Sequence, residues 1–409
     1  MPSKALIAVG LIVVVAIIGG AFVLLQQPPP QQAQAPKPAP APAPQQPAPR
    51  PAPAPAPQQP APAPVPPPAP QLPPPSPPPQ VFVPKEGLQS STVIALNARG
   101  DINLTAANNA LNGEGIIADK QGRLYVTDRI TKGEIYMVDP KSPKLVTVAR
   151  VPKMENTPAT GAKQMVIPSL LGMVFDKAGN LYIAVSGLPG QDPQKPIGFI
   201  LRVPANKLDP VYPGDAEVWA TGVPGANGIT FDSKGNLYVS GRSTIYLVSP
   251  AGGEGKVLKT GVNGTNGIAF SRDGTILWSA NSQNGTIWRI EINPDGTVKG
   301  FTEWLKDPKL AGIDGIQVDI AGNIWGVPNR RNALVAITPD KKIIEVAKND
   351  NKGPLETPAS IVFVGKTIYI YNSDGNNGDN MPRQPGVGPS IAKVEVGIEG
   401  LPLPPEAIR

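Results

Sequence analysis

The chain has 409 residues, with 54 prolines, 43 glycines, a formal net charge of +6, and neither cysteine nor histidine. The missing residue types exclude disulfides, thiolate nucleophiles, iron–sulfur clusters, Ser-His-Asp triads and zinc sites built from Cys or His, so any catalysis must use carboxylates, amides, hydroxyls, lysines or a bound cofactor. Residues 1–84 hold three of the 37 basic residues and no acid, which leaves 34 basic against 31 acidic residues elsewhere. This balance, without a basic run, predicts no nucleic-acid partner.

Residues 5–25 form an uninterrupted apolar run that follows Lys4. A helix of this length rises about 31 Å, which matches the hydrocarbon thickness of a bilayer. We interpret it as a transmembrane anchor of a single-pass protein, with residues 1–4 cytoplasmic and everything after residue 25 extracytoplasmic by the positive-inside tendency. The alternative is a cleaved signal peptide, for which the nearest small-residue pattern is followed at once by Pro36.

Residues 26–84 are rich in Pro, Ala and Gln and contain too few branched or aromatic residues to form a core. Proline fixes φ near the polyproline II value and removes backbone donors, so this segment is predicted to be a disordered, extended stalk. A PxxP ligand for a polyproline-binding domain is the alternative. The folded part is then expected to comprise residues 85–409.

A short sequence unit returns six times in this folded part. In each copy four or five apolar or alternating residues precede a polar turn with glycine, and further β-type residues follow, which predicts two strands joined by a tight turn. A third β-type segment follows each copy, such as STIYLVSP from Ser243. The six copies begin at Glu114, Leu171, Asn227, Asn266, Asp314 and Ala359.

Four short strands that recur about every 40 to 57 residues, without helical periodicity, predict an all-β fold, a six-bladed β-propeller. A large β-sandwich would not require the same turn to return at a similar point each time. The first residue of each copy is equivalent from blade to blade, so rotation about the propeller axis should bring all six residues into one ring at the axial channel. We call these six residues the ring residues.

The ring residues include two carboxylates, Glu114 and Asp314, and two amides, Asn227 and Asn266. Carboxylate and amide oxygens are the ligands of a hard divalent cation, with Ca²⁺ as the first candidate and Mg²⁺ or Mn²⁺ as others. Asn-Gly and Asp-Gly are also frequent turn dipeptides, because Asn, Asp and Gly tolerate positive φ. Each dipeptide alone therefore favours a turn, whereas the four residues together favour a metal site.

The order of the motifs EGIIAD, NGITFDSKGNLYVS, NGIAFSRDGTILWSA, DGIQVDIAGNIWGV and TPASIVF resembles the family of senescence marker protein, gluconolactonase and luciferin-regenerating enzyme. The likeness covers roughly residues 100–395, and a weaker one links the chain to NHL-type propellers. The resemblance implies a six-bladed propeller that holds one divalent cation and hydrolyses a sugar lactone or related ester. By motif it implies Glu114, Asn266 and Asp314 as metal ligands and Asn227 as a substrate-binding amide. No arginine stands just upstream of Asn227 to grip a sugar acid.

The reaction so implied is metal-assisted hydrolysis, and we expect Asp314 to be the general base, because a carboxylate beside a cation can accept the proton of a bound water. The alternative is a non-catalytic propeller that binds an extracytoplasmic protein or polysaccharide. Quinone-dependent sugar dehydrogenases and lyases of antibiotic macrocycles resemble this architecture, but those families rely on a histidine, which this chain lacks. We expect the protein to be a monomer.

An oxygen-rich segment, YNSDGNNGDN, begins at Tyr371. It offers ligands for a second Ca²⁺ but lacks the twelve-residue spacing of an EF-hand loop. Asn, Asp and Gly also dominate turns, so we interpret the segment as a solvated surface turn.

Overall fold

The computed structural model describes residues 82–403 except for residues 97, 100–101, 104–112, 128–131, 159–160, 193–195 and 383–387. The chain divides into two units, Met1–Pro74 and Pro75–Arg409, and every described residue belongs to the second. The expected anchor, residues 5–25, and nearly all of the expected stalk therefore lie outside the described residues.

Among the described residues no helix is both long enough and apolar enough to cross a membrane. This finding contradicts the predicted location, a single-pass membrane protein with an extracytoplasmic propeller, and we withdraw it. The prediction rested on the apolar run of residues 5–25. A run of this length is necessary for a membrane-spanning helix, but it does not by itself show that such a helix forms.

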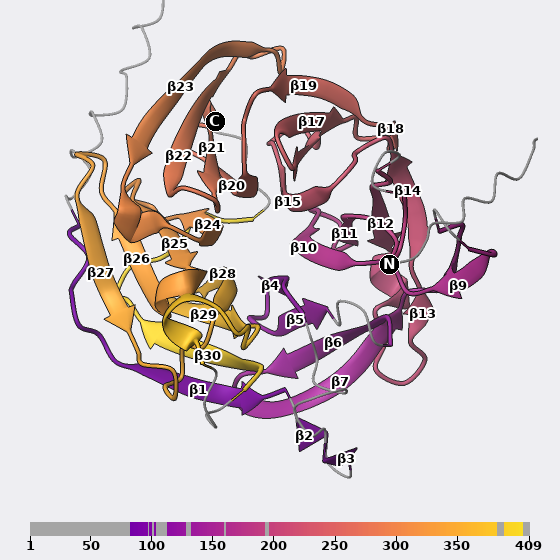
Figure 1. The fold of residues 1–409 in the computed structure, drawn as a ribbon, viewed down its shortest axis with the longest axis horizontal. Helices are drawn as coiled ribbons and strands as arrows, with labels where there is room; N and C mark the ends of the chain where they lie inside the picture. Colours follow the sequence, from indigo (N-terminus) through magenta and orange to yellow (C-terminus); the bar gives the residue numbers. More distant parts are fainter. Residues whose placement is uncertain are drawn as a thin grey trace, which may run out of the picture. The chain divides into compact units, whose positions relative to one another are not determined.

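Six β-sheets stand around a common axis and form the blades of a propeller (Figure 1). The strand nearest the axis in each blade contacts the corresponding strand of the next blade, and β4 contacts both β10 and β28, so the ring is closed. The predicted six-bladed propeller is thus confirmed. The inner strands of blades 1 to 6 are β4 (Ile116–Ala118), β10 (Leu170–Phe175), β15 (Ala226–Phe231), β20 (Thr265–Phe270), β24 (Ile313–Val318) and β28 (Pro358–Val364).

Successive strands of each blade pair antiparallel outwards from the axis. The second strand of each blade is the second half of the repeated unit, and the third strand is the β-type segment that follows the unit. Both are as predicted. The second strands are β5 (Leu124–Thr127), β11 (Leu181–Val185), β16 (Leu237–Gly241), β21 (Ile276–Asn281), β25 (Ile324–Pro328) and β29 (Thr367–Asn372). The third strands are β6 (Glu134–Asp139), β12 (Phe199–Val203), β17 (Thr244–Val248), β22 (Thr286–Ile292), β26 (Ala333–Ile337) and β30 (Ser390–Glu395).

The outer strand of blade 6 comes from the other end of the folded region, because β1 (Ser90–Ala95) pairs antiparallel with β30. Blade 6 therefore joins the first and last parts of the propeller, an arrangement that the repeated unit does not predict. The outer strands of blades 1 to 5 are β7 (Ser142–Arg150), β14 (Glu217–Thr221), β19 (Lys256–Thr260), β23 (Val298–Lys306) and β27 (Ile343–Lys348).

Short additional elements decorate the rim. Two of them, β13 (Gly214–Asp215) and β18 (Gly253–Glu254), pair parallel with β7 and β14, and each thereby extends the preceding blade. Two small hairpins stand apart from the blades, β2 (Ala98–Arg99) with β3 (Ile102–Asn103) and β8 (Met154–Asn156) with β9 (Gln164–Val166). The described 3₁₀ turns are η1 (Ala205–Lys207), η2 (Pro308–Leu310), η3 (Asn329–Arg331) and η4 (Gly378–Asn380).

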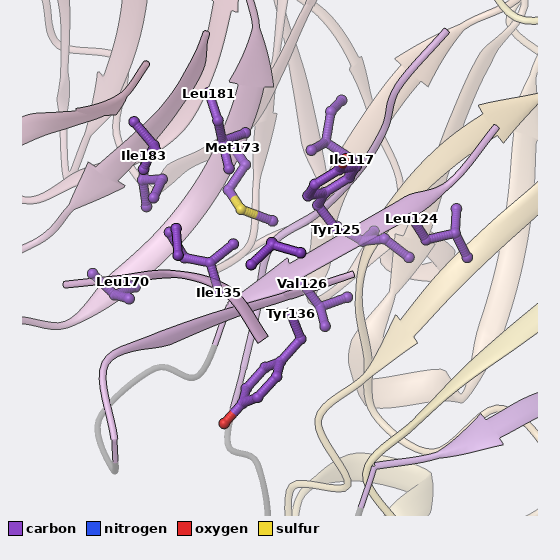
Figure 2. Close-up of a cluster of buried hydrophobic side chains, with 14 of the residues drawn as sticks. Ile117, Leu124, Tyr125, Val126, Ile135, Tyr136, Leu170, Met173, Leu181 and Ile183 are labelled. Atoms are coloured by element: carbon purple, nitrogen blue, oxygen red, sulfur yellow. The ribbon is translucent and has the colours of Figure 1, made fainter. Parts of the chain in front are cut away.

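Neighbouring blades pack through a recurring aromatic contact. Tyr182 in β11 meets Phe231 in β15 of the next blade edge to face, with ring centroids 5.0 Å apart. Such a pair contributes about 0.5–1.5 kcal/mol beyond the area that it buries. Figure 2 shows part of the buried cluster to which Tyr125 of blade 1 and Met173 of blade 2 both belong. The other edge-to-face pairs between blades are Tyr125–Phe175, Tyr238–Phe270 and Trp325–Phe363.

Candidate functional site

The inner strands surround one axial cavity with a volume of about 370 Å³. This is within the range of about 300–1,000 Å³ that small-molecule sites occupy. All four polar ring residues line the cavity, Glu114, Asn227, Asn266 and Asp314, and so does Ala359. Leu171, the remaining ring residue, is buried and is not among the described lining residues. The structure thus brings together the polar side chains that the repeat predicts to meet.

The Asn-Gly and Asp-Gly dipeptides of the ring lie inside strands and do not form turns. Asn227, Asn266 and Asp314 belong to β15, β20 and β24. In each strand the pairing with the next strand shifts register at that point, as in a β-bulge. A bulge bends its strand and re-aims a side chain, which is how a residue within a strand can face the channel. The turn interpretation of these dipeptides is therefore wrong.

A glycine follows every ring residue except Ala359, and it provides room between neighbouring inner strands. A Cβ atom on Gly267 would lie 2.4 Å from the backbone oxygen of Asp314, closer than real Cβ contacts. Each glycine thus lets the backbone of the next ring residue approach, and this approach draws the ring together. The same relationship holds between Gly228 and Asn266 (2.5 Å), Gly172 and Asn227 (2.5 Å), and Gly115 and Leu171 (2.2 Å).

Asp314 is held by a neighbour that carried no signal in the sequence. Its side chain is buried, with 7% of the residue exposed, and its Oδ2 accepts a hydrogen bond of 3.0 Å from Asn329 Nδ2. The backbone N–H of Asn329 donates in turn to the oxygen of Gly312, just before β24. A hydrogen bond to a carboxylate is stronger than one between neutral groups, so Asn329 fixes one carboxylate oxygen of Asp314.

Ser240 fixes the backbone between two ring positions. Its hydroxyl is fully buried, accepts a hydrogen bond of 2.8 Å from Gly228 N–H and donates to the backbone oxygen of Asn266. The first partner belongs to blade 3 and the second to blade 4. This bridge joins the strands that carry Asn227 and Asn266. The equivalent position holds Ala184 in blade 2 and Ala280 in blade 4, so the repeated unit does not mark Ser240.

The donor set of the ring decides which cation it fits. Among the described residues there is no group of three or more His, Cys, Asp or Glu side chains able to hold a metal ion. The ring offers two carboxylates, Glu114 and Asp314, so a bound ion would also need the amide oxygen of Asn266. Oxygen ligands of this mixed kind suit Ca²⁺, Mg²⁺ or Mn²⁺. The residues present therefore fit the expected cation.

The oxygen-rich segment after β29 is not a solvated turn, which corrects the prediction from its composition. Asn372 and Asn380 are fully buried and Asp374 is 6% exposed. The amide of Asn380 donates to Asp374 Oδ1 and to the oxygen of Gly375, over 3.2 and 2.9 Å. The turn η4 packs against η3 of the preceding blade, and a turn preference does not reveal such tertiary packing.

Solved structures share this fold. A luciferin-regenerating enzyme superposes on 72% of this chain, over 95% of its own length, with a TM-score of 0.54 at 15% identity. An aldose sugar dehydrogenase from Streptomyces coelicolor, solved with PQQ bound, superposes over 77% of this chain and its own whole length, with a TM-score of 0.53 at 17% identity. Likeness at such identities shows the fold alone.

Sequence comparison defines the family. No curated protein sequence matches the chain. Residues 112–371 match the sequence profile described as the SMP-30/Gluconolactonase/LRE-like region, which covers more than half of the chain and all of the ring residues. The predicted resemblance is thereby confirmed. The chain belongs to the SMP-30/gluconolactonase/LRE-like family of six-bladed β-propellers.

Proposed function

We propose that this protein hydrolyses a lactone or a related ester with the help of one divalent cation. The observation that supports the proposal is the meeting of two carboxylates and two amides on one axial cavity, in a propeller of a family named after gluconolactonase. A channel filled by side chains would have favoured a non-catalytic binding protein, whereas a cavity bordered by these groups gives a small ester room to react.

In this proposal Glu114, Asn266 and Asp314 hold the cation. A bound ion of this kind polarises the ester carbonyl and lowers the pKa of a bound water. Asp314 accepts the proton of the attacking water, and Asn329 keeps its carboxylate oriented. The water oxygen bonds to the acyl carbon, the ring C–O bond breaks, and the proton passes to the departing oxygen, which yields a hydroxy acid. Asn227 donates its amide N–H to an oxygen of the substrate.

Purified full-length protein is the material for the test. Its bound metal is identified by elemental analysis, and hydrolysis of a panel of lactones and esters is measured with and without a chelator. Chelation should abolish hydrolysis and added Ca²⁺, Mg²⁺ or Mn²⁺ should restore it, because the mechanism needs the ion to polarise the ester carbonyl. Hydrolysis that survives complete removal of metal would overturn the proposed mechanism.

Two variants test whether the ring residues bind the cation. Glu114→Ala and Asp314→Asn should each lose both cation binding and hydrolysis, since each removes a carboxylate ligand. Glu254→Ala and Asp295→Asn are the matched controls, because both side chains are exposed and remote from the cavity lining. If both ring variants bind the cation as tightly as these controls do, the ring is not the metal site.

A further inference from the structure

A second ring, made of apolar side chains, lies beside the polar one. The residue two positions after each ring residue is Ile or Met in every copy. All six of these residues line the same cavity, and each is at most 7% exposed. Rotational equivalence therefore places an apolar collar next to the polar ring. The collar consists of Ile116, Met173, Ile229, Ile268, Ile316 and Ile361.

The cavity ends at the C-terminal segment of the described chain. Leu401 and Leu403 line it, together with Phe270 and Val318 at the ends of their inner strands. The segment is tied to blade 5, because Leu401 N–H donates to the oxygen of Val318 over 2.8 Å. Leu403 packs on the hydrophobic cluster shared by blades 1, 2 and 6, and Leu401 packs on that of blades 4 and 5. The segment therefore extends from one side of the channel to the other.

Among the described residues, charged side chains line this space only at its two ends. The charged side chains among the described lining residues are Glu114 and Asp314 in the polar ring and Arg272 near the far end. Arg272 is exposed, and its Nη1 donates to the backbone oxygen of Ile320. Between the ends, the amide oxygen of Gln317 already accepts from Phe363 N–H. Thr230, Ser271 and Ser360 also line the cavity and offer hydroxyl groups, but the six collar residues are apolar. A polyhydroxylated molecule placed here would replace only part of the hydrogen bonds that it loses to water.

We propose that the substrate is a lactone or ester with a linear alkyl chain, a conclusion that rests on the hydrolase proposed above. Its ester group lies at the polar ring, its alkyl chain passes through the collar, and Leu401 and Leu403 set the longest chain that fits. Burial of each additional methylene should improve kcat/KM roughly fourfold until the chain reaches the C-terminal segment.

The first experiment measures kcat/KM of the full-length protein for γ-butyrolactone, γ-hexalactone, γ-octalactone and γ-decalactone, with D-glucono-δ-lactone as the hydroxylated comparison. The expected result is a stepwise rise along the alkyl series to an optimum, with glucono-δ-lactone below the best alkyl lactone. If glucono-δ-lactone or unsubstituted γ-butyrolactone is the best substrate, the alkyl-chain proposal fails while the hydrolase proposal stands.

Variants of the channel end test the role of the C-terminal segment. Leu403→Ala should move the optimum to a longer alkyl chain, and Leu403→Phe should move it to a shorter one, because they enlarge and reduce the space at the end of the cavity. Val257→Ala is the control, since this side chain is 60% exposed on the outer strand β19. An optimum at the same chain length in all three variants would overturn this role.

A binding measurement separates failure of this inference from failure of the proposed function. Linear primary alcohols from butanol to decanol are added to the full-length protein, and the unfolding temperature is recorded. If no lactone is hydrolysed, the hydrolase proposal fails. A rise in unfolding temperature that grows with chain length would then still support an alkyl-binding channel, and no dependence on chain length would refute it.

Discussion

Asn329 Nδ2 donates a hydrogen bond to Asp314 Oδ2 over 3.0 Å, and the two residues lie at the same end of one antiparallel pair of strands in blade 5. Asp314 lies near the start of β24, and Asn329 follows the end of β25. The antiparallel pairing of the two strands brings these positions together. Asn329 is thus fixed beside the proposed base, Asp314. It orients the carboxylate of Asp314 and is not itself a candidate ligand.

Replacement of this partner should affect catalysis more than cation binding. Asn329→Ala leaves all the proposed ligands in place but removes one hydrogen bond that orients Asp314 Oδ2, so kcat should fall about 10- to 100-fold while KM stays near its wild-type value. The measurements are steady-state kinetics and a cation titration. Asn263→Ala, which changes an exposed side chain, is the control. A kcat for Asn329→Ala equal to that of the control would show that the hydrogen bond has no catalytic role.

The contact between Gly267 and the backbone of Asp314 predicts a large effect of one methyl group. A Cβ atom at this position would also lie 2.6 Å from Ile316 N, so neighbouring strands must move apart. Gly267→Ala should lower the free energy of unfolding by about 1–3 kcal/mol, measured by urea denaturation. In Gly161→Ala the nearest atom is 3.8 Å from the new Cβ, which makes it the matched control. Equal unfolding midpoints for the two variants would contradict the proposed role of the ring glycines.

The two amides of the ring should respond differently to the same change. Asn227→Ala removes the proposed hydrogen bond to the substrate, so kcat/KM should fall about tenfold while cation affinity is unchanged. Asn266→Ala removes a proposed ligand, so cation affinity should fall first. Each variant is the control for the other, because the residues hold equivalent positions in adjacent blades. The opposite pattern in a cation titration would exchange the roles of the two residues.

The polar ring was predictable because it depends on rotational equivalence, which a repeated sequence displays directly. Glu114 and Asp314 are 200 positions apart in the chain, yet each begins a copy of the unit. Local propensity was a poorer guide. It suggested turns for Asn227-Gly228 and Asn266-Gly267, whereas close approach of neighbouring strands requires these glycines.

Features outside the repeated unit could not be predicted. The strand Ser90–Ala95 has an ordinary β-type sequence, and nothing in it indicates that it completes the blade at the other end of the propeller. Asn329 and Ser240 occupy positions where the copies differ from one another. Leu401 and Leu403 follow the last copy, so their place at the end of the cavity depends on tertiary packing alone.

Closure of the ring through β1 predicts that a substitution near this strand destabilises the whole propeller. Leu96 follows β1, is fully buried and packs in the cluster shared by blades 1, 2 and 6. Leu96→Ala should lower the free energy of unfolding by about 2–5 kcal/mol. Val83→Ala is the control, since Val83 is 60% exposed. A single shifted transition in urea would indicate cooperative closure, and an unchanged midpoint would show that β1 contributes little.

Buried tyrosines between the blades predict loss of stability at alkaline pH. Burial raises the pKa of Tyr125 to about 12, and the nearby carboxylate of Asp119, which accepts its hydrogen bond, acts in the same direction. The pKa of Tyr182, beside Asp176, is raised to about 12 for the same reasons. In the unfolded chain a tyrosine loses its proton near its ordinary pKa of about 10.

Between these two values the unfolded chain therefore binds fewer protons than the folded one, so the free energy of unfolding falls as pH rises. Each buried tyrosine contributes up to about 1.4 kcal/mol per pH unit in this window and nothing below it. Urea denaturation from about pH 9 to pH 11 measures the slope. Tyr125→Phe should reduce the slope, whereas Tyr212→Phe should not, because Tyr212 is 82% exposed. A free energy of unfolding that stays constant across this range would contradict the assignment.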